Sequence, residues 1–222
     1  MGWLEEHKEK KEEKGYDTQI SKWQSQCSNV TNCINLAQTF SGTTTDELML
    51  QPGELLYLEA TGVSLIEDRL GAGHWQGRSS GYSVPVAHIG GSAIRYHIGA
   101  TKGTYIQGTP HPEAIDNGNV FITNKRLVFE GAKQTRECDF SKLLGYQHDE
   151  AEGSTTISIS NRQKPITLHY GTEAAPAFEF RLSLALAHYK NSVPQLIEQL
   201  NNTLAQLQSN KPIDPLQNTT KR

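Results

Sequence analysis

The chain has 222 residues, of which 36% are hydrophobic and 20% charged, and its formal net charge at pH 7 is −3. A chain of this length holds one sizeable core, and it is too apolar to be disordered throughout. The slightly acidic balance excludes the general electrostatic footprint of a nucleic-acid-binding protein, whose domain is usually distinctly basic, so we expect no nucleic-acid partner.

Cysteine content and hydropathy indicate the compartment. Cys27, Cys33 and Cys138 are an odd number of cysteines without CxxC spacing, so we expect neither a disulfide framework nor a zinc knuckle. A reducing, cytoplasmic setting fits this pattern best. The first residues mix acidic with basic side chains and contain no apolar segment, so we expect no signal peptide there. No run of about 18 apolar residues occurs, so we expect no transmembrane segment.

Residues 1–45 are expected to form a helical extension. Leu4 to Lys14 are almost all charged, and beyond Gly15 apolar residues recur every three or four positions. This spacing predicts either an amphipathic helix docked on its own domain or a short coiled coil that forms a homodimer through residues 16–37. Polar flanks favour docking, because charged flanking residues would normally select a partner helix. The apolar seam consists of Tyr16, Ile20, Trp23, Cys27, Val30, Ile34 and Ala37.

Residues 46–208 are expected to form the main domain. A turn at Gln51 to Glu54 precedes a first strand, Leu55 to Leu65. Residues 71–112 are rich in glycine, serine and histidine and contain extended pieces joined by glycine turns, which predicts an inserted hairpin or excursion. Short β-rich runs then follow with the cadence of a sandwich or barrel. These runs are Asn119 to Thr123, Leu127 to Glu130, Thr135 to Phe140, Leu144 to His148, Thr155 to Ser160 and Ile166 to Tyr170.

The C-terminal part contains one ambiguous segment and one clear helix. Residues 178–190 alternate like a strand, but their apolar residues also fit one stripe of a helix, so either state remains open. Ser192 is a good N-cap with Pro194 close behind it, and an apolar stripe from Val193 to Leu207 predicts an amphipathic helix. Residues 209–222 have little to bury and are expected to form a flexible tail.

The stretch VFITNKRLVFEG, residues 120–131, predicts a β-hairpin that reverses at Asn124 and Lys125. NGNVFITNKRLVFEG, then CDFSKLLGYQHD, then TTISIS and ITLHY resemble, in this order, the GRAM branch of the pleckstrin-homology-like superfamily. The resemblance covers roughly residues 50–208. It implies a mainly β fold of seven antiparallel strands in two nearly orthogonal sheets, capped at one open end by the C-terminal amphipathic helix. The long excursion and the leading helix depart from the family pattern.

Catalytic and metal sites find little support in the sequence. Eight histidines occur without HxH, HxxxH or HExxH spacing, so we expect no metal or other cofactor. No Gly-x-Ser-x-Gly elbow appears, and no nucleophile comes with a base at an identifiable spacing. We therefore expect a protein that is not an enzyme. A hydrolase that uses the histidine-rich excursion is the remoter alternative.

Charge distribution suggests a binding surface. Residues 90–136 are mainly basic and residues 137–152 mainly acidic, so a small sandwich can carry them on opposite rims. The candidate basic rim consists of Lys102, Lys125, Arg126, Lys133 and Arg136. Such a rim suits an acidic protein partner or peripheral contact with an anionic membrane. The alternative is that these residues are solvated turns, with Arg126 paired to a neighbouring acid.

The sequence thus predicts a binding module that does no chemistry, with protein or lipid headgroups as its ligand. A coiled-coil assembly or scaffold protein is the main alternative, because the seam in residues 16–37 would also suit self-association.

Overall fold

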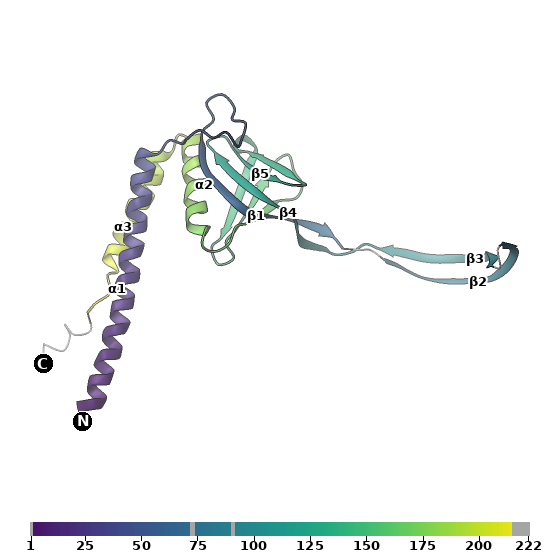
Figure 1. Ribbon diagram of the computed structural model, residues 1–222, viewed down its shortest axis with the longest axis horizontal. Coiled ribbons are helices and arrows are strands. Elements are labelled where there is room, and N and C mark those ends of the chain that lie inside the picture. Colours follow the sequence, from purple (N-terminus) through teal and green to yellow (C-terminus); the bar gives the residue numbers. More distant parts are fainter. Residues whose placement is uncertain (1, 72–73, 90–91, 215–222) are drawn as a thin grey trace.

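The fold is built on one antiparallel sheet of seven strands, with three helices and a two-stranded ribbon that projects from one end of the sheet (Figure 1). The structure is a computed structural model. It describes the backbone of residues 2–71, 74–89 and 92–214, and the side chains of residues 7, 13–71 and 106–214.

The strands follow the apolar alternation of the sequence, and each strand predicted after residue 118 is confirmed, as is the first strand. Along the sheet the order is β6-β5-β4-β1-β9-β8-β7, with every pair antiparallel. The bounds are β1 Leu56–Leu70, β4 Pro110–Thr123, β5 Arg126–Gly131, β6 Thr135–Asp139, β7 Leu143–Asp149, β8 Ser154–Ile159 and β9 Ile166–His169.

A short connection makes the sheet curl. β6 and β7 are its two edge strands, yet only the 3-10 turn η1, Phe140–Lys142, joins them. The turn is held at both ends, because the Phe140 amide donates to the Lys125 carbonyl at 2.9 Å and the Ser160 amide to the Lys142 carbonyl at 2.8 Å. The sheet therefore has a concave face, and its apolar side chains line it.

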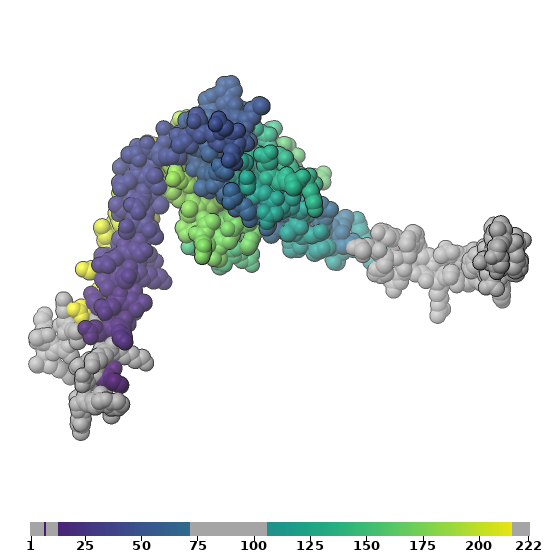
Figure 2. Space-filling model, in the orientation of Figure 1, coloured from purple at the N-terminus to yellow at the C-terminus, as the bar shows by residue number. Residues whose placement is uncertain are grey.

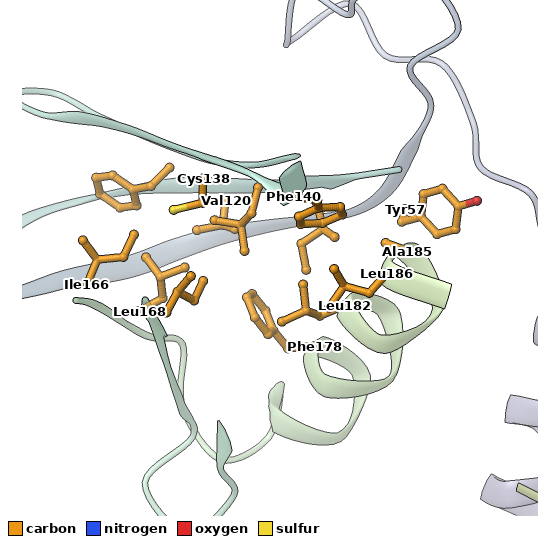
Figure 3. Packing of buried hydrophobic residues seen from close by; sticks show 14 of the residues in the cluster. Tyr57, Val120, Cys138, Phe140, Ile166, Leu168, Phe178, Leu182, Ala185 and Leu186 are labelled. Atoms are coloured by element: carbon orange, nitrogen blue, oxygen red, sulfur yellow. The ribbon is translucent and has the colours of Figure 1, made fainter. Parts of the chain in front are cut away.

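Helix α2, Ala175–Tyr189, fills that concave face. Phe178, Leu182, Ala185 and Leu186 point from α2 toward the strands, where Cys138 and Leu168 are among the residues that meet them (Figure 3). Residues 178–190, which the sequence left open between strand and helix, are thus helical up to Tyr189. The resemblance implied that the amphipathic helix predicted from Val193 to Leu207 would cap the open end. That assignment was wrong, because α2 fills the concave face and the predicted helix follows it as a second C-terminal helix.

That second helix, α3, spans Val193–Ser209 and packs along α1, Gly2–Thr39. The α1 seam is the face that α3 covers: Ile34 and Ala37 are buried at the body, and Trp23 is half-buried at the far end of α3. The Trp23 indole donates a hydrogen bond to the Leu207 carbonyl at 2.6 Å. The seam is therefore packed within the chain. None of the helices in the described ranges is long and apolar enough to cross a membrane.

The segment between α1 and β1 is tied to the sheet (Figure 2, blue, at the top of the body). Thr43 and Leu56 exchange backbone hydrogen bonds of 2.7 and 2.8 Å. Gly42 has a φ of +102°, and a Cβ there would lie 2.6 Å from the Cβ of Leu55, so both backbone conformation and space favour glycine.

The ion pair between Glu54 and Arg126 is the strongest interaction that joins this segment to the sheet. The Glu54 side chain is fully buried, and its two carboxylate oxygens accept hydrogen bonds of 2.8 and 3.1 Å from the Arg126 guanidinium. The Thr123 hydroxyl donates to the same carboxylate at 2.7 Å. Arg126 also pairs with Glu137 at 2.8 Å and donates to the Met49 carbonyl at 2.9 Å. One arginine thus joins the segment, the β4–β5 turn and β6.

The predicted excursion is a hairpin. β2, His74–Ile89, pairs with β3, Ser92–Ile106, in antiparallel register, and the two form a separate sheet (Figure 1). β1 and β4 lead directly into it, since Leu70 of β1 pairs with Pro110 of β4. At about 3.3 Å per residue, strands of this length extend roughly 50 Å.

We expect Trp23→Ala to lower the melting temperature without changing the molecular mass in solution, because the indole packs on α3 of the same chain. Thermal unfolding and light scattering measure the two quantities. Lys22→Ala, on the exposed side of α1, serves as the control. A wild-type dimer that Trp23→Ala converts to a monomer would show that the seam acts between chains.

Arg126→Met should lower the free energy of unfolding by roughly 3 kcal/mol at pH 7, because it leaves the buried Glu54 carboxylate without its partner. Burial alone would raise the pKa of Glu54, but hydrogen bonds from Arg126, Gln51 and Thr123 outweigh it and hold the pKa below its ordinary 4.5. The pair therefore contributes stability above about pH 4.5 and loses it as the pH falls through the lowered pKa.

In the variant, Arg126 no longer opposes the effect of burial, so Glu54 protonates more readily. The difference in free energy of unfolding between wild type and Arg126→Met should therefore become smaller toward pH 4. Urea unfolding at pH 7 and pH 4 tests this, with the exposed Lys142→Met as control. If this difference in free energy of unfolding were equal at pH 7 and pH 4, the ion pair would not be its cause.

Candidate functional site

The β4–β5 turn positions Lys125 and Arg126. Asn124 clamps this turn to the preceding segment, since its side-chain oxygen accepts from the Leu55 amide at 2.9 Å and its amide donates to the Gly53 carbonyl at 3.1 Å. The Thr123 hydroxyl accepts from the backbone amides of Lys125 and Arg126 at 3.1 and 3.0 Å. The sequence TNKR therefore builds a rigid reversal, which explains why a polar group lies between two apolar strands.

Of these two cations, Lys125 keeps more unused hydrogen-bond donors, since the bonds of Arg126 use four of its five N–H groups. The Arg126 guanidinium donates to Glu54, Glu137 and the Met49 carbonyl. The structure thus has the alternative given above, in which Arg126 pairs with neighbouring acids. Lys125 donates from Nζ to the Pro52 carbonyl at 2.5 Å. An ammonium group has three donors, so two remain.

Lys125 and Arg126 border a pocket of about 470 Å³. We call it the loop-end pocket, because it lies where the segment before β1 meets the β4–β5 turn. Its other lining residues include Ser141 of η1, and His188 and Tyr189 from the last turn of α2. The pocket is therefore polar and is built from four separate parts of the chain.

Lys133 and Arg136 lie elsewhere. Lys133 is in the turn after β5, and Lys125 directly precedes that strand, so the two lysines lie at opposite ends of β5, roughly 25 Å apart at the rise of a strand. We call the Lys133 side the ribbon end, because β1 and β4 leave the sheet there. The five cations of the predicted rim are thus divided between two ends of the molecule.

At the ribbon end one carboxylate organises two arginines. Glu67 of β1 accepts from Arg136 Nε at 2.7 Å and from Arg162 Nη2 at 2.8 Å. The hydrogen bond from Arg136 outweighs partial burial and, with the Arg162 charge, holds the pKa of Glu67 below its ordinary value. Lys164 donates to the Asp68 carbonyl at 2.9 Å. The exposed Lys133 and Lys164 lie beside this cluster, but Asp68, Asp116 and Glu113, which is directly opposite Glu67, lie at the same end and balance these cations.

Lys102 belongs to the ribbon itself. Its backbone lies in β3, directly opposite Arg78 of β2, and its side chain is outside the described residues. Like charges directly opposite each other on neighbouring strands are unfavourable, so this register suits a ribbon whose charge is compensated by an anion from outside. Trp75 and Tyr105 form another directly opposed pair in the same register.

Four residues of these sites were not identified from the sequence. Glu67, Arg162 and Lys164 come together only because β1 pairs with β9, and the turn before β9 carries both cations. The pattern of charges within one segment of the sequence does not indicate contacts of this kind between distant strands. His188 escaped for a different reason, because the segment around it had no assigned secondary structure.

Side chains that could bind a metal do not gather in the described ranges. No group of three His, Cys, Asp or Glu that could hold a metal ion occurs there. Burial raises the pKa of Cys138 to about 11, so its thiol is protonated at neutral pH. His148 is enclosed in a polar network, with its Nδ1 2.9 Å from the Tyr170 hydroxyl and 3.0 Å from the Thr155 hydroxyl. The histidine side chains between residues 74 and 97 are outside the described residues.

Comparison with protein-family models, with curated proteins and with solved structures found no significant match to this chain. The site must therefore be interpreted from its own geometry and charge.

Proposed function

We propose that this chain is a non-catalytic binding module that attaches to anionic membrane surfaces through its ribbon end. The observation that carries the proposal is the segregation of charge. Residues 69–112 contain four basic residues and no acidic one, although the chain as a whole has a net charge of −3. The positive charge is thus concentrated on the projecting ribbon, and the remaining residues together are more acidic than the chain as a whole. The four cations are Arg69, Arg78, Arg95 and Lys102.

The distance between ribbon and body supports this assignment. A ribbon of roughly 50 Å is several times longer than the distance of about 8 Å over which physiological salt screens exposed charges. The acidic body would therefore feel little repulsion from a negatively charged surface in contact with the outer part of the ribbon. Each Lys or Arg near such a surface contributes about 1 kcal/mol to attachment.

The uncharged outer part of the ribbon favours a lipid surface over an acidic protein. Residues 79–94 contain no Lys, Arg, Asp or Glu, and they include Tyr82, Val84, Val86 and Ile94. An uncharged, partly apolar segment bordered by cations suits the boundary between lipid headgroups and acyl chains. Backbone groups along the ribbon edges need water or other partners, so contact at headgroup depth fits better than full insertion.

Lys133 and the Glu67 cluster extend the same surface at the base of the ribbon. Arg136 and Arg162 are fixed by Glu67, and Lys133 and Lys164 remain exposed. Asp116 reduces this charge, since it accepts from the amides of Lys133 and Gln134 at 2.7 Å each. The base therefore adds to the attraction less than the ribbon does.

The proposal predicts which lysines matter for membrane binding. Lys102→Gln removes one positive charge on the ribbon, which should weaken partition onto vesicles containing phosphatidylserine by roughly fivefold, at about 1 kcal/mol per cation near the surface. Lys133→Gln, at the base of the ribbon, should weaken partition less. Lys125→Gln removes the same kind of charge at the other end and should leave partition almost unchanged. Sedimentation with vesicles at low and high salt measures these effects.

Wild-type binding should also weaken as salt rises, because the attraction is between exposed charges. Absence of wild-type sedimentation at low salt would refute the membrane contact. An equal loss for Lys125→Gln would show that the surface is not confined to the ribbon end. Lys102 is on the ribbon and Lys125 and Lys133 are in turns, so circular dichroism should show unchanged folding in all the variants.

A further inference from the structure

We infer that the loop-end pocket binds a small dissolved oxyanion of the phosphate type. This site lies at the end of β1 and β4 opposite the ribbon, and the inference does not depend on the membrane contact. The argument uses the donors that the pocket offers, an unpartnered imidazole nitrogen, the local charge and the size of the cavity.

The donors come from two walls. Lys125 contributes two free N–H groups from the β4–β5 turn, because only its bond to the Pro52 carbonyl is made within the described residues. The end of α2 contributes the His188 ring and the hydroxyl of Tyr189, whose side chain is 40% exposed. A tetrahedral phosphate presents oxygens in several directions and can accept from both walls, whereas a carboxylate presents only two oxygens in one plane.

His188 carries the most specific indication. Its Nε2 is buried and has no hydrogen-bond partner among the described residues. A ligand oxygen would reach this enclosed atom only after a small movement of the ring, and the contact would recover the free energy that an unpartnered buried polar atom costs. The ring is otherwise held in place, since it packs on the Tyr57 ring with centroids 5.5 Å apart, and the Tyr57 hydroxyl donates to the Ser41 carbonyl at 3.1 Å.

One lining residue opposes an anion. Asp139 accepts from the Ser141 amide at 2.9 Å, and the hydrogen bonds from Ser141 hold the pKa of Asp139 below its ordinary value, so it is ionised. Lys142 and Arg126 add to that lowering, which shows that their positive charges act on the same carboxylate. Because Arg126 is already paired with Glu54 and Glu137, Lys142 is the cation that offsets Asp139, and the Lys125 ammonium, which donates only to the Pro52 carbonyl, is the positive charge that remains for a ligand.

The dimensions fit a small ligand. A volume of about 470 Å³ accommodates a phosphate group together with a small organic portion. A membrane in contact with the ribbon would lie at the other end of the sheet, so a dissolved anion is the more accessible source.

Thermal unfolding of the full chain in inorganic phosphate tests the inference. At constant ionic strength, the melting temperature should rise with phosphate concentration relative to chloride, following the linkage between ligand binding and stability. Lys125→Met should raise the dissociation constant for phosphate at least tenfold. Lys133→Met, which removes a lysine at the other end of β5, should bind phosphate as the wild type does. This matched variant also controls for the general stabilisation that phosphate gives by exclusion from protein surfaces.

His188→Gln provides a second test, because it removes the imidazole but retains a side-chain amide donor. It should weaken phosphate binding less than Lys125→Met does. Identical phosphate responses in wild type, Lys125→Met and Lys133→Met would refute the site. Binding of glycerol phosphate in solution, measured by calorimetry, should match that of inorganic phosphate or exceed it. Binding only to phosphate groups presented on vesicles would overturn the assignment to a dissolved ligand, while leaving the ribbon contact to its own test.

Discussion

The curled sheet depends on one constraint, which is that its two edge strands are joined by a turn of only three residues. β6 and β7 must approach each other at η1, so the sheet cannot flatten, and its concave face needs an apolar occupant. α2 meets that need with Phe178 and Leu182, which are almost completely buried. The chain then leaves α2 beside the N-terminal segment, which allows α3 to lie along α1. The short turn thus explains why α2 packs on the sheet and why α3 packs on α1.

Local patterns made much of this fold predictable. The strands from β4 onward are short runs rich in β-branched and aromatic residues, and polar or glycine residues occupy the turns between most of them, so their positions were evident from sequence. α2 was ambiguous for a physical reason: Leu182, Leu184, Ala185 and Leu186 are all buried, so the helix has no broad polar face to reveal its period. The docking of the α1 seam was favoured but its partner helix was not identified, since sequence periodicity does not name the surface that covers it.

The candidate site was harder to predict because charge in a β protein is distributed by topology. Lys125 and Lys133 are close in sequence, yet a single strand carries them to opposite ends of the sheet. Glu67, Arg136 and Arg162 are distant in sequence and meet side by side. Arg126 matched the family-like hairpin pattern, and its role here is to hold Glu54 and Glu137 in place. A basic residue count therefore overstates the charge available to a ligand, and paired arginines must be separated from free lysines.

The continuity of β1 and β4 has a mechanical consequence. Both strands run from the Glu54 and Arg126 ion pair to the base of the ribbon, and within the sheet they are flanked by β9 and β5. A force applied along the ribbon would pull these strands lengthwise past their neighbours, so the hydrogen bonds that join β1 to β9 and β4 to β5 would be loaded together in shear. A ladder stressed in this direction resists rupture better than one that opens bond by bond. The ribbon is thus anchored in the part of the fold best suited to carry tension.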